Sequence, residues 1–318
     1  MRIDHQQAWD LLCSMDRILL LTHRLPDGDA LGSIYALYLV LKSLGKTVRC
    51  ETDAIPSSLR AAAIPCDGPA FEPDHIVALD MGDRKLMGDA LNERYGGRVD
   101  LCIDHHGTHS PYAKYTLVDP TASVASEVLF DMLKLVGFTI TEPIARELYI
   151  GISTDTGCFR YGNTTAKAMR AAADLMECGI DTEYLNTELF ETKTPEYAAF
   201  ERMALNALKT YYDGKCAVMV VTRAMYEESG LDEADDKAVN ALPRQIRGVY
   251  VGVTVKEKKD GGFRVSMRSK EPFDAAAVCA TLGGGGHRLA AGTELTGTAE
   301  EVVGEILDAV KPALEKIG

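Results

Sequence analysis

The sequence lacks the cysteine spacing that marks a zinc ribbon or a disulfide framework. Its eight cysteines are scattered along 318 residues, and no two of them form a CxxC pair. We interpret most of them as small buried hydrophobic residues in a reducing cytoplasm. No apolar run reaches the roughly 18 residues of a membrane-spanning helix, and no signal-peptide pattern follows Met1. We therefore expect a cytoplasmic protein with no membrane partner.

An excess of basic residues is also missing. The chain carries 34 lysines and arginines against 47 acidic residues, which gives a formal net charge of −13 at pH 7. A protein that coats long duplex nucleic acid needs a broad basic surface, so we exclude that class of partner. A small anionic substrate handled by metal ions is compatible with this charge. The hydrophobic content of 46% suffices for two domain cores, which we favour over one large core.

The residues from 22 to 33 are expected to form a turn between a strand and a helix. A short, fully apolar run at 18–21 precedes them, as in a buried parallel strand. A helical pattern from 34 to 44 follows them and stops at a glycine. In an open α/β sheet, ligands bind at the carboxyl ends of strands, where such turns lie.

This turn holds one imidazole and two carboxylates, those of His23, Asp27 and Asp29. Two neighbouring carboxylates repel each other unless a positive group lies between them, and a divalent cation is the simplest such group. The alternative is that Asp27 and Asp29 are ordinary turn and N-cap residues. The residues of this turn alone do not decide between these interpretations.

Apolar runs and helical patterns alternate through the first half of the chain. We expect strands at 17–21, 47–51, 75–79 and 99–103. We expect helices at 5–15, 123–136, 142–152 and 163–179. Strands that alternate with helices indicate an α/β fold with a doubly wound parallel sheet.

Acidic and imidazole side chains recur where these elements end. Asp80 follows the third expected strand, and Asp104, His105 and His106 follow the fourth. Asp155 comes just after the helix expected at 142–152. Because the carboxyl ends of parallel strands share one edge of a sheet, we expect these side chains to converge on one crevice.

A long, polar helix expected at 195–211 suits a connector between two domains. Beyond it we expect three strands and a closing helix, at 217–221, 249–256, 262–268 and 299–317. We therefore divide the chain into a first domain over 1–190, a connector over 191–213 and a smaller α/β domain over 214–318.

Basic residues gather in the second domain. Between Arg244 and Lys270 the sequence has eight basic residues and two acidic ones, a local charge of +6. The lysines in this stretch are typical of a solvated strand face. Arg268 differs because it ends an expected strand shortly before a glycine-rich turn, and an arginine there can hold a phosphate through two hydrogen bonds.

That turn spans residues 283–292 and begins with four consecutive glycines, followed by His287 and Arg288. Glycines let backbone N–H groups approach a ligand closely, and they adopt positive φ at little steric cost. A flexible linker is the alternative. Linkers do not usually place histidine and arginine directly beside the glycines, so we favour a loop that cradles an anion.

Taken together, these motifs resemble a known family. Their order and spacing are similar to those of the four motifs of the DHH phosphoesterase superfamily. In this sequence the four motifs are His23-x3-Asp27-x-Asp29, Asp80, Asp104-His105-His106 and Asp155. The segment 283–292 resembles the GGGGH signature of the associated DHHA1 domain. The two resemblances cover almost the whole chain, and its size and plan resemble the nanoRNase/pAp phosphatase branch most closely.

The resemblance implies two metal ions. It assigns the first ion to His23, Asp27 and Asp80. It assigns the second ion to these ligands: Asp29, Asp80, His105 and Asp155. Mixed imidazole and carboxylate ligands suit Mn²⁺ better than Mg²⁺, which prefers oxygen, although Mg²⁺ also fits. Two such ions hold the nucleophile and clamp the phosphoryl oxygens during in-line attack.

Other roles follow from the same resemblance. With Asp80 as the bridging ligand, Asp104 orients its neighbours, and His106 contacts the phosphate or assists the leaving oxygen. These three are the expected catalytic residues. The remaining histidines outside the motifs receive no such support, and we interpret them as surface or structural residues: His5, His75 and His109.

The resemblance also implies that the second domain binds the far end of the substrate, with the active site in the cleft between the domains. The expected substrate-binding residues are Arg268, Gly284, Gly285, Gly286 and His287. Arg160 and Asn163, just past Asp155, are further candidates, and an interpretation as ordinary polar loop residues is equally open.

The implied activity is hydrolysis of short RNA oligonucleotides and linear dinucleotides to mononucleotides, together with conversion of 3′-phosphoadenosine 5′-phosphate (pAp) to AMP. Three alternatives stay open: a phosphodiesterase for cyclic dinucleotides such as c-di-AMP, a manganese inorganic pyrophosphatase, and a catalytically silent nucleotide-sensing module. The glycine-rich turn argues against the pyrophosphatase. The family includes homodimers, so a homodimer is compatible with the resemblance.

Overall fold

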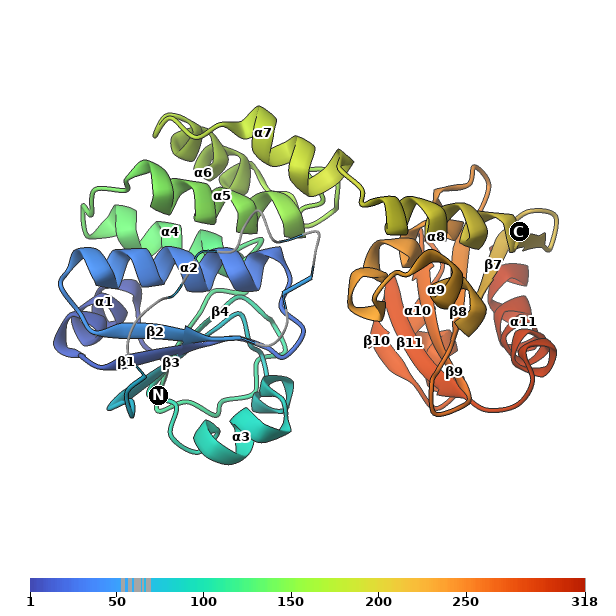
Figure 1. Cartoon of the computed structure of the whole chain (residues 1–318), viewed down its shortest axis with the longest axis horizontal. Helices are drawn as coiled ribbons and strands as arrows, with labels where there is room; N and C mark the ends of the chain where they lie inside the picture. The colour runs from blue at the N-terminus through green and yellow to red at the C-terminus, as the bar shows by residue number, and fades with distance from the viewer. Residues whose placement is uncertain (53–54, 57–58, 60–63, 65, 67–69, 318) are drawn as a thin grey trace. The chain divides into compact units, whose positions relative to one another are not determined.

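Two sheets organise the chain, one in each of two units, Met1–Thr192 and Lys193–Gly318, in a computed structural model of the protein (Figure 1). The structure describes residues 1–317 except 53–54, 57–58, 60–63, 65 and 67–69. Each unit has a hydrophobic core of its own. Within the described residues, no helix combines the length and apolar character needed to cross a membrane.

The first unit is built on five parallel strands in the order β2-β1-β3-β4-β5. Their bounds are β1 Ile18–Leu21, β2 Val48–Glu51, β3 His75–Leu79, β4 Leu101–Asp104 and β5 Tyr115–Val118. From β1 the chain moves outward to β2 and then returns to β3 on the other side of β1. The strand order therefore reverses between β1 and β3, and such a switch point is where open α/β sheets bind ligands.

The strand β1 shows that this sheet is buried on both faces. All four of its residues have no exposed surface. Ile18 and Leu20 belong to the core on one face, and Leu19 and Leu21 to the core on the other, since successive strand side chains point to opposite sides. Burying each of these side chains contributes roughly 1.5–3 kcal/mol.

Helices cover both faces of the first sheet, as Figure 1 shows. The larger core contains α1 (His5–Ser14), α2 (Gly28–Ser43), α4 (Ala125–Leu135), α5 (Glu142–Asp155) and α6 (Ala166–Met176). The other face packs against α3 (Asp89–Tyr95) and the 3₁₀ turn Arg84–Met87. The helix α7 (Thr182–Asn186) and the π-helical turn Thr187–Glu191 end the unit. The predicted doubly wound parallel sheet is confirmed.

The second unit contains a mixed six-stranded sheet in the order β10-β11-β9-β8-β7-β6. The strands β7 and β8 run parallel; the other neighbours are antiparallel. The strand bounds are β6 Leu208–Tyr211, β7 Cys216–Val221, β8 Val251–Glu257, β9 Phe263–Ser269, β10 Gly285–His287 and β11 Ala290–Leu295. The predicted smaller α/β domain is therefore also confirmed.

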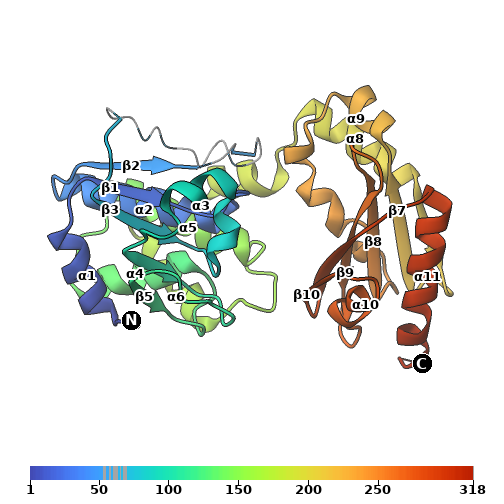
Figure 2. The ribbon, with the colours of Figure 1, turned by 90° about the horizontal axis from the view of Figure 1, so that it is seen from below.

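Helices bury both sides of this second sheet. The helices α10 (Ala275–Thr281) and α11 (Ala299–Glu315) share a core with β8 and β9, and Figure 2 shows α11 alongside the sheet. The helices α8 (Pro195–Asn206) and α9 (Arg223–Ser229) form a smaller core with β7. Three 3₁₀ turns follow α9, at Glu233–Asp235, Lys237–Ala241 and Pro243–Gln245.

The helix predicted at 195–211 is shorter than expected. It ends at Asn206, and residues Leu208–Tyr211 form β6, which pairs with β7. The side chain of Phe200 on this helix is buried with Met219 of β7. The connector helix is therefore packed into the second unit, because its apolar residues find partners there.

The glycine-rich segment is a hairpin rather than a loop. Gly285–His287 is β10, and it pairs with the following strand β11. A Cβ at Gly286 would lie 2.7 Å from the backbone oxygen of Ala290, and this glycine has a φ of +142°. Only glycine fits that position, so the glycines allow the two strands to approach closely.

Candidate metal centre and substrate site

The carboxyl edge of the first sheet collects most of the predicted ligands. His23 lies two residues beyond β1, Asp80 follows β3 directly, and Asp104 ends β4. His105 and His106 continue from β4. Since β3 lies between β1 and β4, three neighbouring strands bring these side chains to the switch point.

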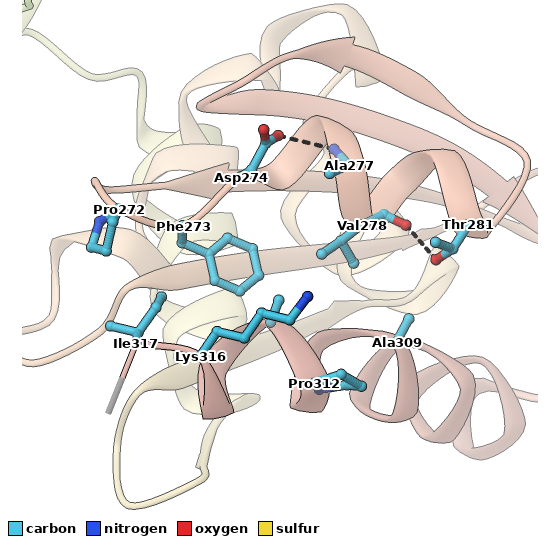
Figure 3. Close-up of a pocket in the computed structure, with 11 residues that line it drawn as sticks. Pro272, Phe273, Asp274, Ala277, Val278, Thr281, Ala309, Pro312, Lys316 and Ile317 are labelled. Atoms are coloured by element: carbon cyan, nitrogen blue, oxygen red, sulfur yellow. Dashed lines mark hydrogen bonds between the residues drawn. The ribbon is translucent and has the colours of Figure 1, made fainter.

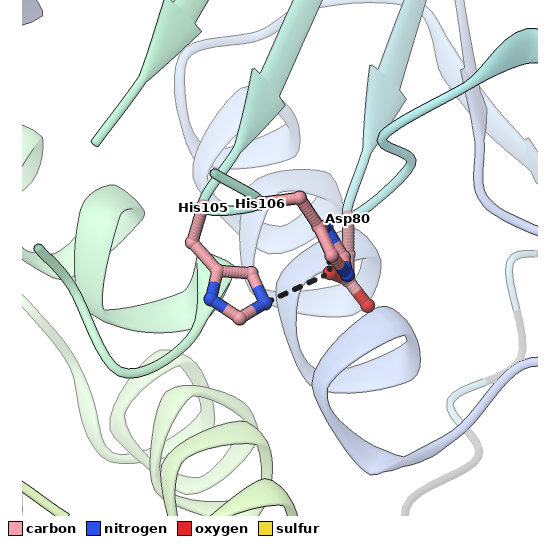
Figure 4. A group of neighbouring side chains, drawn as sticks. All are labelled: Asp80, His105 and His106. Atoms are coloured by element: carbon pink, nitrogen blue, oxygen red, sulfur yellow. Dashed lines mark ion pairs between the residues drawn. The ribbon is translucent and has the colours of Figure 1, made fainter. Parts of the chain in front are cut away.

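Asp80 lies close to three imidazoles, two of which, those of His105 and His106, are drawn with it in Figure 4. Its Oδ1 is 3.5 Å from His105 Nε2 and 3.7 Å from His106 Nδ1, and its Oδ2 is 3.6 Å from His23 Nε2. Asp80 is buried, and among the described residues its Oδ1 accepts no hydrogen bond. These separations are long for hydrogen bonds, but two ligand atoms each about 2.1 Å from one ion are roughly 3–4 Å apart. The orphaned oxygen therefore fits a cation.

The backbone at Asp80 is also unusual. Its φ is +51°, in the left-handed region that residues with a side chain rarely adopt. Such a conformation costs on the order of 1–3 kcal/mol and persists where the surroundings hold it in place. The strand β3 therefore ends at Leu79, and the backbone changes direction at Asp80, the residue whose carboxylate faces the imidazoles.

Two groups of donor atoms share Asp80. One consists of His23, Asp27 and Asp80, and the other of Asp80, His105 and His106; within each group the donor atoms lie within 4.8 Å of one another. This set of imidazoles and carboxylates fits a divalent metal ion. The geometry also places His106 among the potential ligands, whereas sequence reasoning gave it a phosphate contact.

Asp27 serves a structural purpose as well. Its Oδ1 accepts a hydrogen bond from the backbone N–H of Ala30 at 3.1 Å and caps α2. Its Oδ2 lies 3.8 Å from His23 Nε2. The N-cap interpretation is therefore confirmed for Asp27, and the second oxygen faces the centre.

Without a cation, the carboxylates keep protons on two imidazoles. Burial alone would lower the pKa of His23, but the nearby carboxylates of Asp27 and Asp80 outweigh burial and raise it to about 10. His105 behaves in the same way. Burial would lower its pKa, but the Asp80 carboxylate outweighs burial and raises the pKa to about 10. Burial would raise the pKa of Asp80, but the imidazoles hold it well below its usual range. A bound divalent cation would displace these protons.

Asp29 is close to the negative charges of Asp80 and Asp155, but its carboxylate is hydrogen-bonded to backbone N–H groups. It is 1% exposed, and its oxygens accept hydrogen bonds from the backbone N–H groups of Ala125 at 2.6 Å and Ser126 at 2.9 Å. Burial raises the pKa of Asp29 to about 7, and the charge of Asp80 adds to this rise. The structure thus gives Asp29 the role of capping the start of α4. Its role as a metal ligand stays a prediction.

Asp155 is the last residue of α5, which extends beyond the predicted end at residue 152. The pKa of Asp155 is raised to about 6, mainly by burial and further by the negative charges of Asp27 and Asp80. The three carboxylates are therefore close enough to interact. The amide of Asn163 donates a hydrogen bond to its Oδ2 at 3.2 Å. Among the described residues, neither compact donor group includes Asp155, and its role as a ligand stays a prediction.

Asp104 is fully buried behind His106. Its Oδ1 is 2.7 Å from His106 Nδ1, and its Oδ2 is 2.5 Å from His109 Nδ1. Burial would raise the pKa of Asp104, but its hydrogen bond with His106 lowers it. The His109 side chain is 7% exposed, so it is not a surface residue. Sequence reasoning missed this contact, and the only signal was the proximity of His109 to the Asp104-His105-His106 motif.

In the second unit, Arg268 and His287 lie on one row of the sheet. Arg268 of β9 pairs with Ala290 of β11, and Ala290 pairs with His287 of β10. Directly opposite residues in antiparallel strands point to the same face. The row therefore places Arg268 and His287 on one face, next to the predicted glycines Gly284, Gly285 and Gly286. Phosphate binding by this face stays a prediction.

Arg160 is attached to its own turn. Its Nε donates a hydrogen bond to the backbone oxygen of Gly157 at 2.5 Å, and its guanidinium lies 6.0 Å from the centroid of the Phe190 ring. These contacts fix the side chain beside the end of α5. A contact of Arg160 with substrate stays a prediction.

A cavity of about 640 Å³ lies between α10 and α11 in the second unit. Figure 3 shows Phe273 and Val278 on one side of it and Pro312 and Ile317 on the other. None of the predicted site residues lines this cavity. We therefore keep it separate from the candidate site.

Comparison with known proteins places both units in a family. The DHH family, N-terminal domain, matches residues 17–152, and the DHHA1 domain matches residues 213–316. A Thermus thermophilus protein named bifunctional oligoribonuclease and PAP phosphatase NrnA is 33% identical, covering 95% of this chain and 91% of its own. The chain belongs to the DHH family. The first match includes the residues of both donor groups and ends before Asp155.

Further relatives and solved structures match most of the chain. A Bacillus subtilis protein with the same name is 27% identical and covers 88% of this chain and 90% of its own. The crystal structure of an exopolyphosphatase-related protein from Bacteroides fragilis has a TM-score of 0.88 at 25% identity, covering 97% of this chain and 96% of its own. RecJ from Thermus thermophilus in complex with Mn²⁺ shares the fold, with a TM-score of 0.56 at 15% identity over 97% of this chain and 54% of its own.

Proposed function

We propose that this DHH family member is a metal-dependent phosphoesterase that hydrolyses short oligoribonucleotides and linear dinucleotides to mononucleotides and converts pAp to AMP. The observation that carries the proposal is the buried Asp80 carboxylate, which two groups of donor atoms share at the switch point of the sheet. The names of the relatives from Thermus thermophilus and Bacillus subtilis support this class of substrate.

Two Mn²⁺ ions are the proposed cofactors. His23, Asp27 and Asp80 would hold one of them, in agreement with the first donor group. The other would have these ligands: Asp80, His105, Asp29 and Asp155. When bound, such ions polarise the phosphoryl group and lower the pKa of the attacking water.

The protein's own groups position the substrate around this centre. With Nδ1 engaged by Asp104, His106 has its Nε2 left for the substrate, where it contacts the phosphate or gives a proton to the leaving oxygen. Asp104 is fully buried and acts only by orienting the imidazole. Proton transfer by a positioned side chain contributes roughly 10²–10⁴-fold to rates of this kind.

The second unit supplies an anion site. Arg268 and His287 share a face with the glycine hairpin, and a guanidinium can bind a phosphate through two parallel hydrogen bonds. A terminal phosphate bound there would select short substrates with a free end over long duplexes. The local excess of basic residues between 244 and 270 supports this assignment.

An assay of several substrates in Mn²⁺ tests the proposal. The panel contains pAp, pApA, pGpG, c-di-AMP, a five-nucleotide RNA and inorganic pyrophosphate, with a long RNA duplex as the control. We expect release of mononucleotides from the linear dinucleotides and the short RNA, release of AMP from pAp, and an intact duplex. Turnover of pyrophosphate or c-di-AMP alone would contradict the proposal. Tight nucleotide binding without turnover would instead identify a silent sensing module.

A further inference from the structure

His109 is built into the base of the candidate centre, although it belongs to none of the sequence motifs. Its Nδ1 meets Asp104 Oδ2 at 2.5 Å, while His106 Nδ1 meets Oδ1 of the same carboxylate at 2.7 Å. Asp104 has no exposed surface. One buried carboxylate thus binds two imidazoles, one on each oxygen, and a carboxylate that only accepts hydrogen bonds requires a proton on both Nδ1 atoms.

The backbone around His109 is fastened to the loop that carries Asp80. The His109 N–H donates to the carbonyl of His106 at 3.1 Å, and the Ser110 N–H donates to the carbonyl of Gly82 at 2.7 Å. The Tyr112 hydroxyl donates to the carbonyl of Met81 at 3.0 Å. These bonds close the turn after His106 and hold it against the neighbouring loop, so the position of the His109 ring is fixed.

The same contacts confine the His106 ring. A Cβ at Gly82 would lie 3.2–3.3 Å from Cβ and Cγ of His106, so the ring packs directly against this backbone. The His105 ring lies 4.5 Å away, measured between centroids. The remaining constraint is the hydrogen bond to Asp104, and it fixes the ring only if the carboxylate itself cannot rotate. The second bond of that carboxylate, to His109, prevents this rotation.

We propose that His109 is a positioning residue that acts through Asp104 to hold the His106 imidazole with Nδ1 toward the carboxylate and Nε2 toward the substrate. The kinetic consequence rests on the proposed function, whereas the orientation of the ring does not. Removing the donor leaves a buried carboxylate oxygen without its partner, and the carboxylate then rotates or shares its remaining bond. Supporting groups of this kind affect activity by about 10–100-fold when they are lost.

Two amide substitutions at His109 distinguish the loss of the hydrogen bond to Asp104 from the loss of the imidazole ring itself. In His109→Asn the amide nitrogen takes the place of Nδ1 and keeps the bond to Asp104. In His109→Gln the longer side chain places its nitrogen near the position of Nε2 and loses that bond. The control is His75→Gln, since His75 lies at the opposite end of β3, and its Nδ1 is 3.5 Å from Asp100 without a hydrogen bond among the described residues.

Two measurements are made on each folded variant. Long-range ¹H–¹⁵N spectra of the metal-free protein report which ring nitrogen of His106 carries the proton. We expect a proton on Nδ1 of His106 in the wild type, in His109→Asn and in His75→Gln, and in His109→Gln a population of molecules in which Nδ1 has lost that proton. With pApA and Mn²⁺, we expect kcat of His109→Gln to fall about 10–100-fold with KM within about twofold, and His109→Asn to recover most of the loss.

The possible results separate the role of His109 from the proposed function. A wild-type His106 spectrum together with wild-type kcat in His109→Gln would overturn the positioning role. Equal losses in His109→Asn and His109→Gln would also overturn it, because the Nδ1 donor would then not matter. A wild-type protein that turns over none of the substrates would refute the proposed function alone, and the spectra would still decide the role of His109.

Discussion

Gly28 and Thr154 approach so closely that a Cβ on Gly28 would lie 2.1 Å from the Thr154 hydroxyl oxygen. Gly28 stands between Asp27 and Asp29 at the start of α2, and Thr154 precedes Asp155 at the end of α5. This contact therefore sets the distance between the first and the last segments of the predicted ligand set. The packing of the start of α2 against the end of α5 therefore positions Asp27 and Asp29 relative to Asp155.

The variant Gly28→Ala tests the importance of this contact. The added methyl forces α2 and α5 apart, so we expect a loss of about 1–3 kcal/mol of unfolding free energy and at least a tenfold lower kcat. The matched control is Gly304→Ala in α11, where a Cβ meets no atom within 4 Å and helix propensity favours alanine by up to about 1 kcal/mol. Urea unfolding and steady-state kinetics measure both effects. A Gly28→Ala variant with wild-type stability and kcat would disprove the role of the contact.

The two raised imidazole pKa values predict how the stability of the metal-free protein depends on pH. His23 and His105 have an ordinary pKa of 6.5 that rises to about 10 in the fold. A raised folded pKa stabilises the protein fully below pH 6.5, and this contribution is lost as the pH rises from 6.5 to 10. For His23 alone the slope is at most about 1.4 kcal/mol per pH unit.

Comparison with His23→Gln isolates this effect. We expect the difference in unfolding free energy between the metal-free wild type and His23→Gln to shrink steadily between pH 6.5 and pH 10. His75→Gln serves as the control, since its histidine lies at the other end of β3. Urea unfolding in EDTA at several pH values measures the difference. A difference that stays constant across this range would be incompatible with a proton held on His23.

Arg268 and Arg264 offer a matched pair for the anion site. Both lie on β9 at positions of the same parity, hence on the same face, and Arg264 pairs with Glu294 at 3.9 Å. We expect Arg268→Ala to raise KM for a five-nucleotide RNA at least tenfold with little change in kcat, because the contact would serve binding of the ground state. Arg264→Ala should change KM less than threefold. An effect of Arg268→Ala confined to kcat would rule out a binding role.

Much of the first unit could be predicted from the sequence. The strands β1, β3 and β4 are short apolar runs, and runs of this kind between helical patterns are typical of strands in a parallel sheet that is buried on both faces. Their positions also fixed where the side chains that follow them would gather. His23, Asp80 and His105 accordingly lie together at one edge.

The remaining features depend on contacts that a linear pattern does not contain. The strand β5 is buried at only its two middle residues, so its apolar pattern is weaker than that of β1 or β4. The segment Gly285–His287 is a strand only through its pairing with β11. Asp29 turned out to cap α4, a helix nearly a hundred residues later in the chain. The partner of Asp104 Oδ2 is His109, and only the folded turn shows that this imidazole points inward.

In the proposed mechanism, one buried carboxylate, that of Asp80, serves two metal ions. Asp80→Asn tests this double role, because the amide keeps the shape of the side chain and removes its negative charge. Asp83→Asn is the control: Asp83 lies three residues later and its carboxylate caps the turn at Arg84–Met87 through the N–H of Lys85. Circular dichroism should show that both variants are folded.

Calorimetric titration of the metal-free proteins with Mn²⁺ gives the number of bound ions and their affinities, and so reports on this double role without an assay of turnover. We predict two ions per chain in the wild type and in Asp83→Asn, and at least a 100-fold loss of affinity at both sites in Asp80→Asn. Two ions bound by Asp80→Asn with wild-type affinity would show that Asp80 does not bridge them.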